Sequence, residues 1–328
     1  AVAAALLIGL IAFAWQAKVA RTQRDRAGIA ETQARAAEAQ SERRAADLKQ
    51  VSEFQAKMLS QIDPTDAGVK LMAGIRKRFA DALNKAKVPG AEADTRIATF
   101  DRELAEVNAT DTAVELIDRT ILKPAIVAVD AQFKEQPLVD ASLRHSVAEI
   151  YRTLGVFDDA APLQSSALAT RRRLLGDADP LTLHSLNNMA LVLMDQGSTS
   201  EAGKMFREAV EGNTRVLGPD DPETLRAMSN LGNLYRDEGK FSEAEPLLRS
   251  AVERSRRVHG DDHRDTLIAI NSLATLFAHQ GKFGEAEPLW REVHERGTRA
   301  LGADDPDVLA WTFNLGGLIE QQGRAKEA

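Results

Sequence analysis

Residues 229–252 read SNLGNLYRDEGKFSEAEPLLRSAV, and this stretch decides the fold. Apolar residues recur at spacings of three and four on both sides of Gly239, as in two amphipathic helices joined by a turn. Glycine suits that turn because it adopts left-handed backbone conformations without steric cost. Neither helix can bury its apolar stripe alone, so neighbouring pairs must complete the core. The stretch therefore predicts one unit in a stack of helix pairs.

The same pattern returns every 42 residues. Glycines mark the end of each second helix and the turn inside each unit, at Gly176, Gly218, Gly260 and Gly302 and at Gly155, Gly197, Gly239, Gly281 and Gly323. A small residue keeps the spacing in the second helix, at Ala160, Ala202, Ala244, Ala286 and Ala328. Repetition at such a period is typical of a solenoid. We expect an all-α protein with an α-solenoid over residues 136–328, in units near 136–176, 177–218, 219–260, 261–302 and 303–328, the last one truncated.

The register of core residues resembles the tetratricopeptide repeat. Leu231-Gly232, Tyr235, Gly239 and Ala244 follow that repeat's order of apolar, small and aromatic residues. The period of 42 residues is similar to the longer repeat of kinesin light chains, of which LGPDDPETL (217–225) also looks typical. The resemblance implies a solenoid of helix pairs that binds a peptide or protein in a concave groove.

The composition limits what the chain can do. Its 328 residues include 42 Lys and Arg against 49 Asp and Glu, a formal net charge of −7. This acidic balance argues against a nucleic-acid partner, because a nucleic-acid binder must neutralise phosphates. Cysteine is absent, which excludes disulfides, thiolate metal sites and a cysteine nucleophile. We expect no cofactor.

Motifs for catalysis do not occur in the sequence. There is no Gly-rich phosphate loop, DFG or APE triplet, HExxH or Gly-x-Ser-x-Gly. The kinase catalytic-loop triplet HRD is spelled at 263–265, but it occupies the loop that reads DDPET or DDPDV in other units. The segment HGDDH at 259–263 has the residue types of a metal site, yet its register makes the two aspartates part of the repeat turn. We therefore expect no enzyme and no metal site within this chain.

The part before the repeats divides into three segments. Residues 1–17 begin with the uncharged run AVAAALLIGLIAFAW, which we interpret as a truncated transmembrane helix; a clipped signal peptide and a buried helix are the alternatives. Residues 18–62 are rich in Ala, Gln, Glu and Arg and predict a juxtamembrane helical stalk. Residues 63–135 predict a helical connector. The side of the membrane on which the repeats lie stays open, because the positive-inside rule compares both flanks of a span.

A second resemblance covers most of the chain. The order of membrane span, helical stalk, VSEFQAKMLSQIDP (51–64) and 42-residue repeats resembles the region after the kinase domain of large membrane-anchored bacterial serine/threonine protein kinases. It implies a single-pass protein of the bacterial inner membrane, with the repeats as the sensor or docking part. It carries over no catalytic residue. The alternatives are a full-length protein that is itself a serine/threonine kinase and a solenoid that self-associates; a homodimer through the stalk is a further expectation.

Recognition is the chemistry that remains. On the first helix of each unit, one polar register directly precedes an inward apolar residue, and stacking places this register as a row along the concave surface. A side-chain amide offers both a donor and an acceptor, so spaced asparagines can bind a peptide backbone. By resemblance to peptide-binding tetratricopeptide proteins, this role is carried over to Asn188, Asn230 and Asn314, with Ser272 at the same register. The other predicted groove residues lie on the same or comparable helix faces: Arg226, Asn233, Asp237 and His279. The alternative is that the asparagines only join neighbouring repeats by hydrogen bonds.

Overall fold

The computed structural model describes residues 64–324, and every regular element within them is a helix. The prediction of an all-α fold is confirmed for this part of the chain. The predicted span at 1–17 and the predicted stalk at 18–62 lie outside the described residues. Among the helices of 64–324, none combines the length and the apolar character that crossing a bilayer requires.

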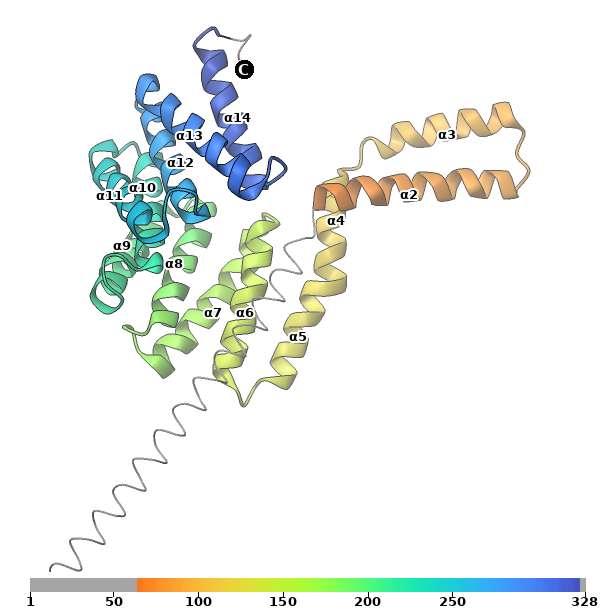
Figure 1. Ribbon diagram of the computed structural model, residues 1–328. Helices are drawn as coiled ribbons and strands as arrows, with labels where there is room; N and C mark the ends of the chain where they lie inside the picture. Colours follow the sequence, from red (N-terminus) through yellow and green to blue (C-terminus); the bar gives the residue numbers. More distant parts are fainter. Residues whose placement is uncertain (1–63, 325–328) are drawn as a thin grey trace, which may run out of the picture. The chain divides into compact units, whose positions relative to one another are not determined.

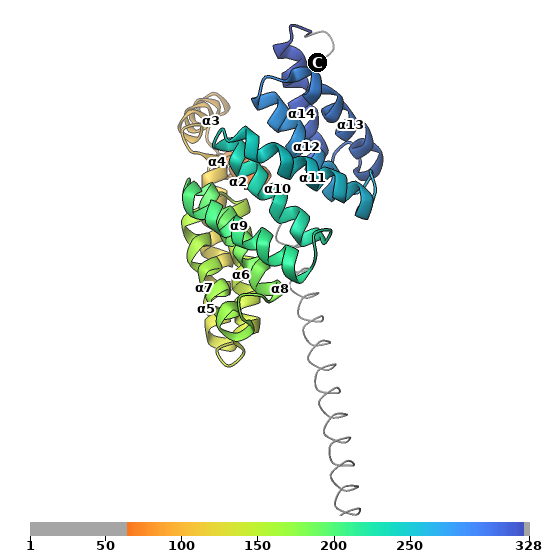
Figure 2. The ribbon, with the colours of Figure 1, turned by 90° about the vertical axis from the view of Figure 1, so that its left-hand side faces the viewer.

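The repeats are pairs of one first and one second helix (Figure 1). Their bounds are α6 (Pro137–Thr153), α7 (Phe157–Leu175), α8 (Pro180–Asp195), α9 (Thr199–Val216), α10 (Pro222–Asp237), α11 (Phe241–His259), α12 (Arg264–His279), α13 (Phe283–Leu301) and α14 (Pro306–Gln321). Each helix packs against the next, and the first helices α8, α10, α12 and α14 also contact one another in succession (Figure 2). The predicted α-solenoid is thereby confirmed. We call the surface formed by the first helices the first-helix face.

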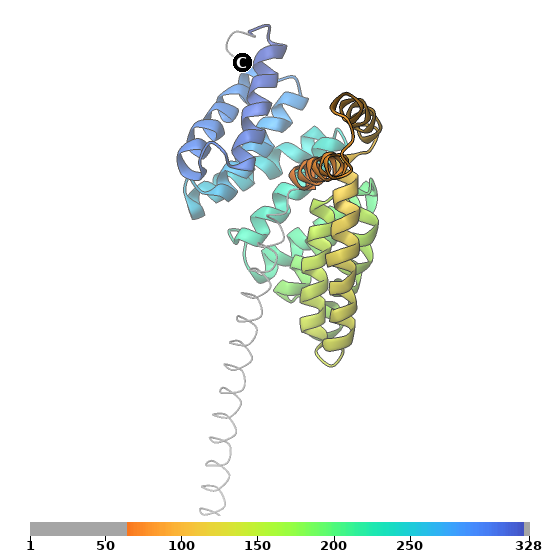
Figure 3. The same cartoon turned by 90° about the vertical axis from the view of Figure 1, so that its right-hand side faces the viewer.

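A helical connector precedes the repeats. Its elements are α2 (Pro64–Lys85), α3 (Gly90–Leu104), α4 (Ala109–Ile117), η1 (Asp118–Leu122) and α5 (Lys123–Gln132). Helices α2 and α3 form a hairpin, which Figure 3 shows nearly end-on. The rings of Phe79 and Phe100 stack within it, with centroids 4.4 Å apart. Helix α2 also packs on α4, where Gly68 lies against the backbone of Ala109 and leaves no room for a methyl group.

The connector is tied to the first repeat through η1, a π-helical turn between α4 and α5. Pro124 follows this turn and has no N–H to give to it, and a π-turn is one way in which a helix absorbs an interruption. Asp118 in the turn accepts hydrogen bonds from the Tyr151 hydroxyl (2.6 Å) and from Lys123 Nζ (2.5 Å). Because Tyr151 belongs to α6, this contact fastens the connector to the solenoid.

Turn and cap residues repeat together with the helices. Gly197, between α8 and α9, has a φ of 80°, in the left-handed region that favours glycine. Asp221 caps α10, where its carboxylate accepts from the backbone N–H two residues on (2.9 Å). His263 takes this place in α12 and accepts with Nδ1 from the backbone N–H of Asp265 (3.2 Å). The HRD triplet at 263–265 is therefore the start of a repeat helix.

Small residues let the two helices of a unit approach closely. The alanines of the second-helix register that lie within residues 64–324 are fully buried: Ala160, Ala202, Ala244 and Ala286. Gly232 in α10 shows how tight the contact is, because a Cβ placed on it would lie 2.7 Å from Leu248 Cγ in α11. The apolar stripes of both helices are thereby removed from water, which is the main source of stability for such a unit.

One contact between successive units is filled differently at each repeat. Two facing registers, 14 residues apart, hold the pairs Arg171/Ser185, Asn213/Ala227, Ser255/Ala269 and Gly297/Trp311, all buried. At one end of the series Arg171 Nη1 donates to Ser185 Oγ (2.6 Å). At the other end a Cβ on Gly297 would lie 2.6 Å from Trp311 Cζ3. At both ends of the series a large residue on one helix is thus matched by a small one on the other, with the large residue on opposite sides. The contacts between successive units, which we call seams, therefore differ from one another.

The acidic loops between units form ion pairs with the second helix that follows. Asp220 contacts Arg254 (2.7 Å) and Arg257 (2.5 Å). The same arrangement recurs 42 residues later with Asp262, Arg296 (2.8 Å) and Arg299 (2.9 Å). The predicted role of the acidic pair as part of the repeat turn agrees with these contacts. Within 64–324, no three His, Asp or Glu side chains are grouped in a way that could hold a metal ion.

Candidate ligand-binding face

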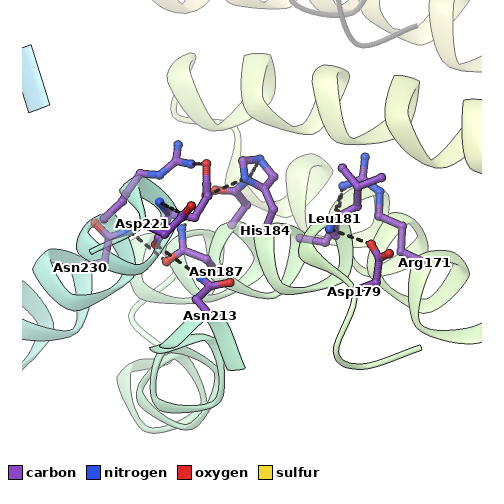
Figure 4. A network of polar contacts seen from close by, with 12 residues as sticks. Arg171, Asp179, Leu181, His184, Asn187, Asn213, Asp221 and Asn230 are labelled. Atoms are coloured by element: carbon purple, nitrogen blue, oxygen red, sulfur yellow. Dashed lines mark hydrogen bonds and ion pairs between the residues drawn. The ribbon is translucent and has the colours of Figure 1, made fainter. Parts of the chain in front are cut away.

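A chain of polar side chains crosses the seam between α8 and α10 on the first-helix face (Figure 4). Asn230 Nδ2 donates to Asn187 Oδ1 (3.1 Å), and Asn187 Nδ2 donates to Asn188 Oδ1 (3.5 Å). Asn188 Nδ2 lies 2.9 Å from His184 Nε2, and His184 Nδ1 lies 3.1 Å from Glu223 Oε2. Two successive units are therefore joined by hydrogen bonds between their first helices.

The next two seams carry related contacts. Asn233 Nδ2 of α10 donates to Ser272 Oγ of α12 (3.2 Å). Asn314 Nδ2 of α14 donates to Asn271 Oδ1 of α12 (3.3 Å), and that same oxygen accepts from the indole N–H of Trp290 in α13 (2.8 Å). Each seam from α8 to α14 thus has an amide that donates across it.

A buried cation lies at the seam between α6 and α8. Arg171 is only 4% exposed, and among the described residues its guanidinium donates to neutral oxygens: Ser185 Oγ (2.6 Å), Ser142 Oγ (3.2 Å) and the Leu181 carbonyl (3.4 Å). Burial lowers the pKa of Arg171 to about 10, although the charge of Asp179 opposes the shift. The side chain therefore stays charged at neutral pH and links the second helix of one unit to two first helices.

Two histidines from successive units meet beside this cation. The rings of His145 (α6) and His184 (α8) lie edge to face, with centroids 5.2 Å apart. His145 Nδ1 lies 2.9 Å from Gln164 Oε1, while Gln164 Nε2 is committed to a backbone carbonyl of α8 (3.0 Å), so His145 is the donor. Burial first, and then the positive charges of His184, Arg171 and Arg226, lower the pKa of His145 to about 3. His145 is therefore neutral at physiological pH.

Three of the eight predicted groove residues are used inside the solenoid. Asn188 is 6% exposed and Ser272 is 5% exposed. Asn233 is half-buried and has both ends engaged, because its Oδ1 accepts from Arg236 Nη1 (2.9 Å) while its Nδ2 donates to Ser272. In this conformation these side chains hold the units together.

The other five reach the surface. Asn230 and Asn314 are half-buried, and within the part of the chain that the structure describes their Oδ1 atoms accept no hydrogen bond. Arg226, which pairs with Glu223 of the same helix, is exposed. Asp237 and His279 are exposed as well. The predicted role of the eight residues in binding a peptide stays a prediction, and the surface-reaching five are the ones that a ligand can contact.

Sequence reasoning missed the partners that hold the amides in place. Asn187 is 2% exposed, and Asn271 lies between two donors, the indole of Trp290 and the amide of Asn314. A signal for them exists in the sequence. Asn187-Asn188 is an adjacent polar pair inside an otherwise apolar helix, and Asn271 precedes a serine in the same way. Two adjacent polar residues on one helix cannot both face the same way, so one of them must turn towards a neighbouring helix.

Replacing Trp290 by phenylalanine is expected to destabilise the seam between α12 and α14. The ring is kept, but Asn271 Oδ1 loses the indole N–H that donates to it at 2.8 Å. A buried neutral hydrogen bond contributes about 1 kcal/mol to the free energy of unfolding. The measurement is urea unfolding followed by circular dichroism. Trp311→Phe is the matched control, because that indole makes no hydrogen bond among the described residues; equal losses in both variants would contradict the assignment.

Comparison with known proteins adds a family to this geometry. Family models of the tetratricopeptide repeat match residues 141–181, 181–257, 229–289 and 265–328, which together are more than half of the chain. The chain belongs to the tetratricopeptide repeat family. Repeats of this kind are typically non-catalytic scaffolds, and this tetratricopeptide repeat protein is accordingly a scaffold for protein–protein interaction. No protein with a curated description matches the sequence.

Solved structures resemble this tetratricopeptide repeat protein in fold. BtubC (BKLC) from P. vanneervenii is 20% identical, with a TM-score of 0.54 over 64% of this chain and 87% of that chain. A putative kinesin light chain from Podosopora anserina with nearly identical TPR-like repeats is 19% identical, with a TM-score of 0.42 over 74% of this chain and 99% of that one. Likeness at this level of identity shows the fold alone.

Proposed function

We propose that the first-helix face binds an extended segment of a partner protein. The observation that carries the proposal is the pair Asn230 and Asn314, which stand at one register two units apart. Their amide nitrogens hold the seams, whereas their Oδ1 atoms, on half-buried side chains, accept nothing within residues 64–324. An extended peptide presents backbone N–H groups that such acceptors can bind irrespective of its sequence. The exposed Arg226, Asp237 and His279 then supply contacts that depend on the partner's side chains.

The test begins with a selection. A phage library of random peptides is panned on the immobilised full chain, and the affinity of the selected peptides is measured by calorimetry. The double variant Asn230→Ala, Asn314→Ala is expected to weaken binding about 5- to 100-fold, because each neutral hydrogen bond contributes about 0.5–1.5 kcal/mol. The double variant should also lose about 1–3 kcal/mol of stability, because both amides donate across a seam between units. The affinity is therefore measured at a temperature at which circular dichroism shows the variant to be fully folded.

A matched control separates this effect from a general loss of amides. Asn84 lies exposed on α2, away from the first-helix face, so Asn84→Ala should leave the affinity unchanged. Peptides that bind the double variant as tightly as the unaltered chain would remove the groove assignment.

We also propose that residues 1–17 anchor the chain in a bacterial inner membrane, with residues 18–62 as a stalk. What supports this is the uncharged run at the start of the sequence and the helix-forming segment after it. Full-length chain expressed in bacteria should stay in the membrane fraction through alkaline extraction, whereas residues 63–328 should not. Recovery of the full chain in the supernatant would contradict the anchor.

A link to a serine/threonine kinase belongs to the same proposal. It is supported by the order of apolar run, stalk and 42-residue repeats. Reading the coding sequence upstream of residue 1 tests it, because a kinase parent requires a Gly-rich loop followed by HRD and DFG motifs. Self-association of the solenoid, or of the stalk as a homodimer, is the competing function. Sedimentation at several concentrations decides it, since a mass independent of concentration would exclude self-assembly.

A further inference from the structure

Five side chains, beginning with Glu223 and ending with Asn230, form a chain of hydrogen bonds. The donor and the acceptor of each hydrogen bond in this chain can be assigned. The links are Glu223 to His184 (3.1 Å), His184 to Asn188 (2.9 Å), Asn188 to Asn187 (3.5 Å, the longest) and Asn187 to Asn230 (3.1 Å). Figure 4 labels three of them, His184, Asn187 and Asn230. An imidazole and an amide can each donate or accept at a given contact, depending on the tautomer or on the rotation of the amide. The assignment must therefore start from a group that can only accept or only donate.

Glu223 is that group. Burial alone raises the pKa of Glu223, but the hydrogen bond and charge of His184, together with Arg226, outweigh it and lower the pKa to about 2. The carboxylate is therefore ionised at neutral pH and only accepts. His184 must donate to it with Nδ1–H, and a neutral imidazole then has a lone pair on Nε2. Asn188 must in turn present its Nδ2 to that lone pair.

The same argument assigns the donors and acceptors of the amides between Asn188 and the surface. With Nδ2 of Asn188 engaged, its Oδ1 accepts from Asn187 Nδ2, and Asn187 Oδ1 is left to accept from Asn230 Nδ2. Asn230 is then obliged to present its Oδ1 outward. We infer that Glu223 and His184 are positioning residues that make Asn230 an acceptor on the first-helix face, and that a proton added to His184 reverses the amides and makes Asn230 a donor.

The reversal follows from the second nitrogen of His184. A protonated ring donates from both nitrogens, so Asn188 must turn its carbonyl towards Nε2, and Asn187 and Asn230 must follow. The charged and titratable groups around His184 are His145 from α6, Arg171 from α7, and Glu223 and Arg226 from α10.

The chain contains its own reference for this behaviour. Asn314 has the same register, but its orientation is set by Trp290, whose indole N–H only donates to Asn271 and does not titrate. Asn271 Oδ1 must therefore accept from Asn314 Nδ2 at every pH. Of the two surface amides, Asn230 is connected to a group that can gain a proton, and Asn314 is connected to one that cannot.

The significance of this inference rests on the proposed function, because the orientation of the Asn230 amide decides whether a ligand must donate or accept there. Its test needs no ligand, so either can fail alone. The full-length chain, labelled with 15N and deuterium, is followed by NMR from pH 8 to pH 5. The expected result is a neutral His184 ring with its proton on Nδ1, and side-chain amide signals of Asn188, Asn187 and Asn230 that shift together when the ring gains a second proton. The Asn314 amide should stay in place.

Two variants sharpen the experiment. In Glu223→Gln the partner of His184 can donate or accept, so the single Nδ1–H tautomer should be lost and replaced by a mixture. His279→Gln, which replaces an exposed histidine outside this chain of hydrogen bonds, should leave the His184 tautomer and the Asn230 amide signal unchanged. The inference is overturned by a His184 ring protonated on Nε2 at pH 8, by a titration of His184 that leaves the Asn230 amide unmoved, or by a His184 that stays neutral until the protein unfolds. The unaltered chain alone supplies these outcomes, should Glu223→Gln fail to fold.

Discussion

Trp311→Ala is expected to lower the stability of the C-terminal repeats by about 3–5 kcal/mol. Trp311 is 2% exposed, and its ring lies over Gly297, where a Cβ would be 2.6 Å away. Truncation leaves a cavity that the glycine cannot fill. Because a repeat contacts only its neighbours, the loss should appear in hydrogen exchange as reduced protection of α13 and α14, with α6 and α7 unaffected.

A second substitution tests whether the two positions act as a pair. Gly297→Ser combined with Trp311→Ala reproduces the combination that Ser255 and Ala269 form one unit earlier, so it should recover part of the loss. Gly297→Ser alone should instead destabilise the chain by about 1–3 kcal/mol, because it overpacks the ring. Additive losses in the double variant would show that the registers are independent. Gly316→Ala is a suitable control, since no atom outside its own helix turn lies near that Cβ.

Acidification from pH 7 to pH 5 is expected to cost about 2 kcal/mol of the free energy of unfolding through His145 alone. Its pKa is about 3 in the folded chain against 6.5 for a free histidine, so between these values the unfolded chain binds a proton that the folded chain does not. Stability therefore rises with pH over this window. The measurement is urea unfolding at several pH values.

His145→Gln should flatten this pH dependence. Glutamine keeps a donor for Gln164 Oε1 but does not titrate. His279→Gln is the control, because it replaces an exposed histidine that lies outside the contacts of His145. Identical slopes for His145→Gln and the unaltered chain would show that another group carries the dependence.

The repeat architecture could be predicted because the 42-residue spacing recurs at many positions of the sequence. Gly197 and Ala202 each have a local reason to recur, a left-handed turn and a close helix approach, and both recur in the structure as the register predicts. The chemistry of the face could be predicted only in part. The register of Asn188 and Asn230 is the same, yet Asn188 is buried and Asn230 half-exposed.

The reason is that side-chain roles at a seam depend on two units at once. Asn188 is buried because His184 and Asn187 enclose it, and Ser272 is buried because Asn233 reaches it from the preceding helix. A pattern that treats every repeat as equivalent cannot contain this information. The polar partners differ from seam to seam, as do the volumes at the interior pairs.

The graded series of interior pairs has a consequence for how such a protein can change in length. Copying one unit and inserting it elsewhere would place side chains together whose volumes do not match. Trp311 of the fifth unit would collide with Arg171 if it followed the first unit. Ser185 of the second unit would leave a void beside Gly297 if it followed the fourth unit. Growth by duplication would therefore have to be followed by substitutions on both flanks of the insert. The contacts between units therefore determine which unit can follow which.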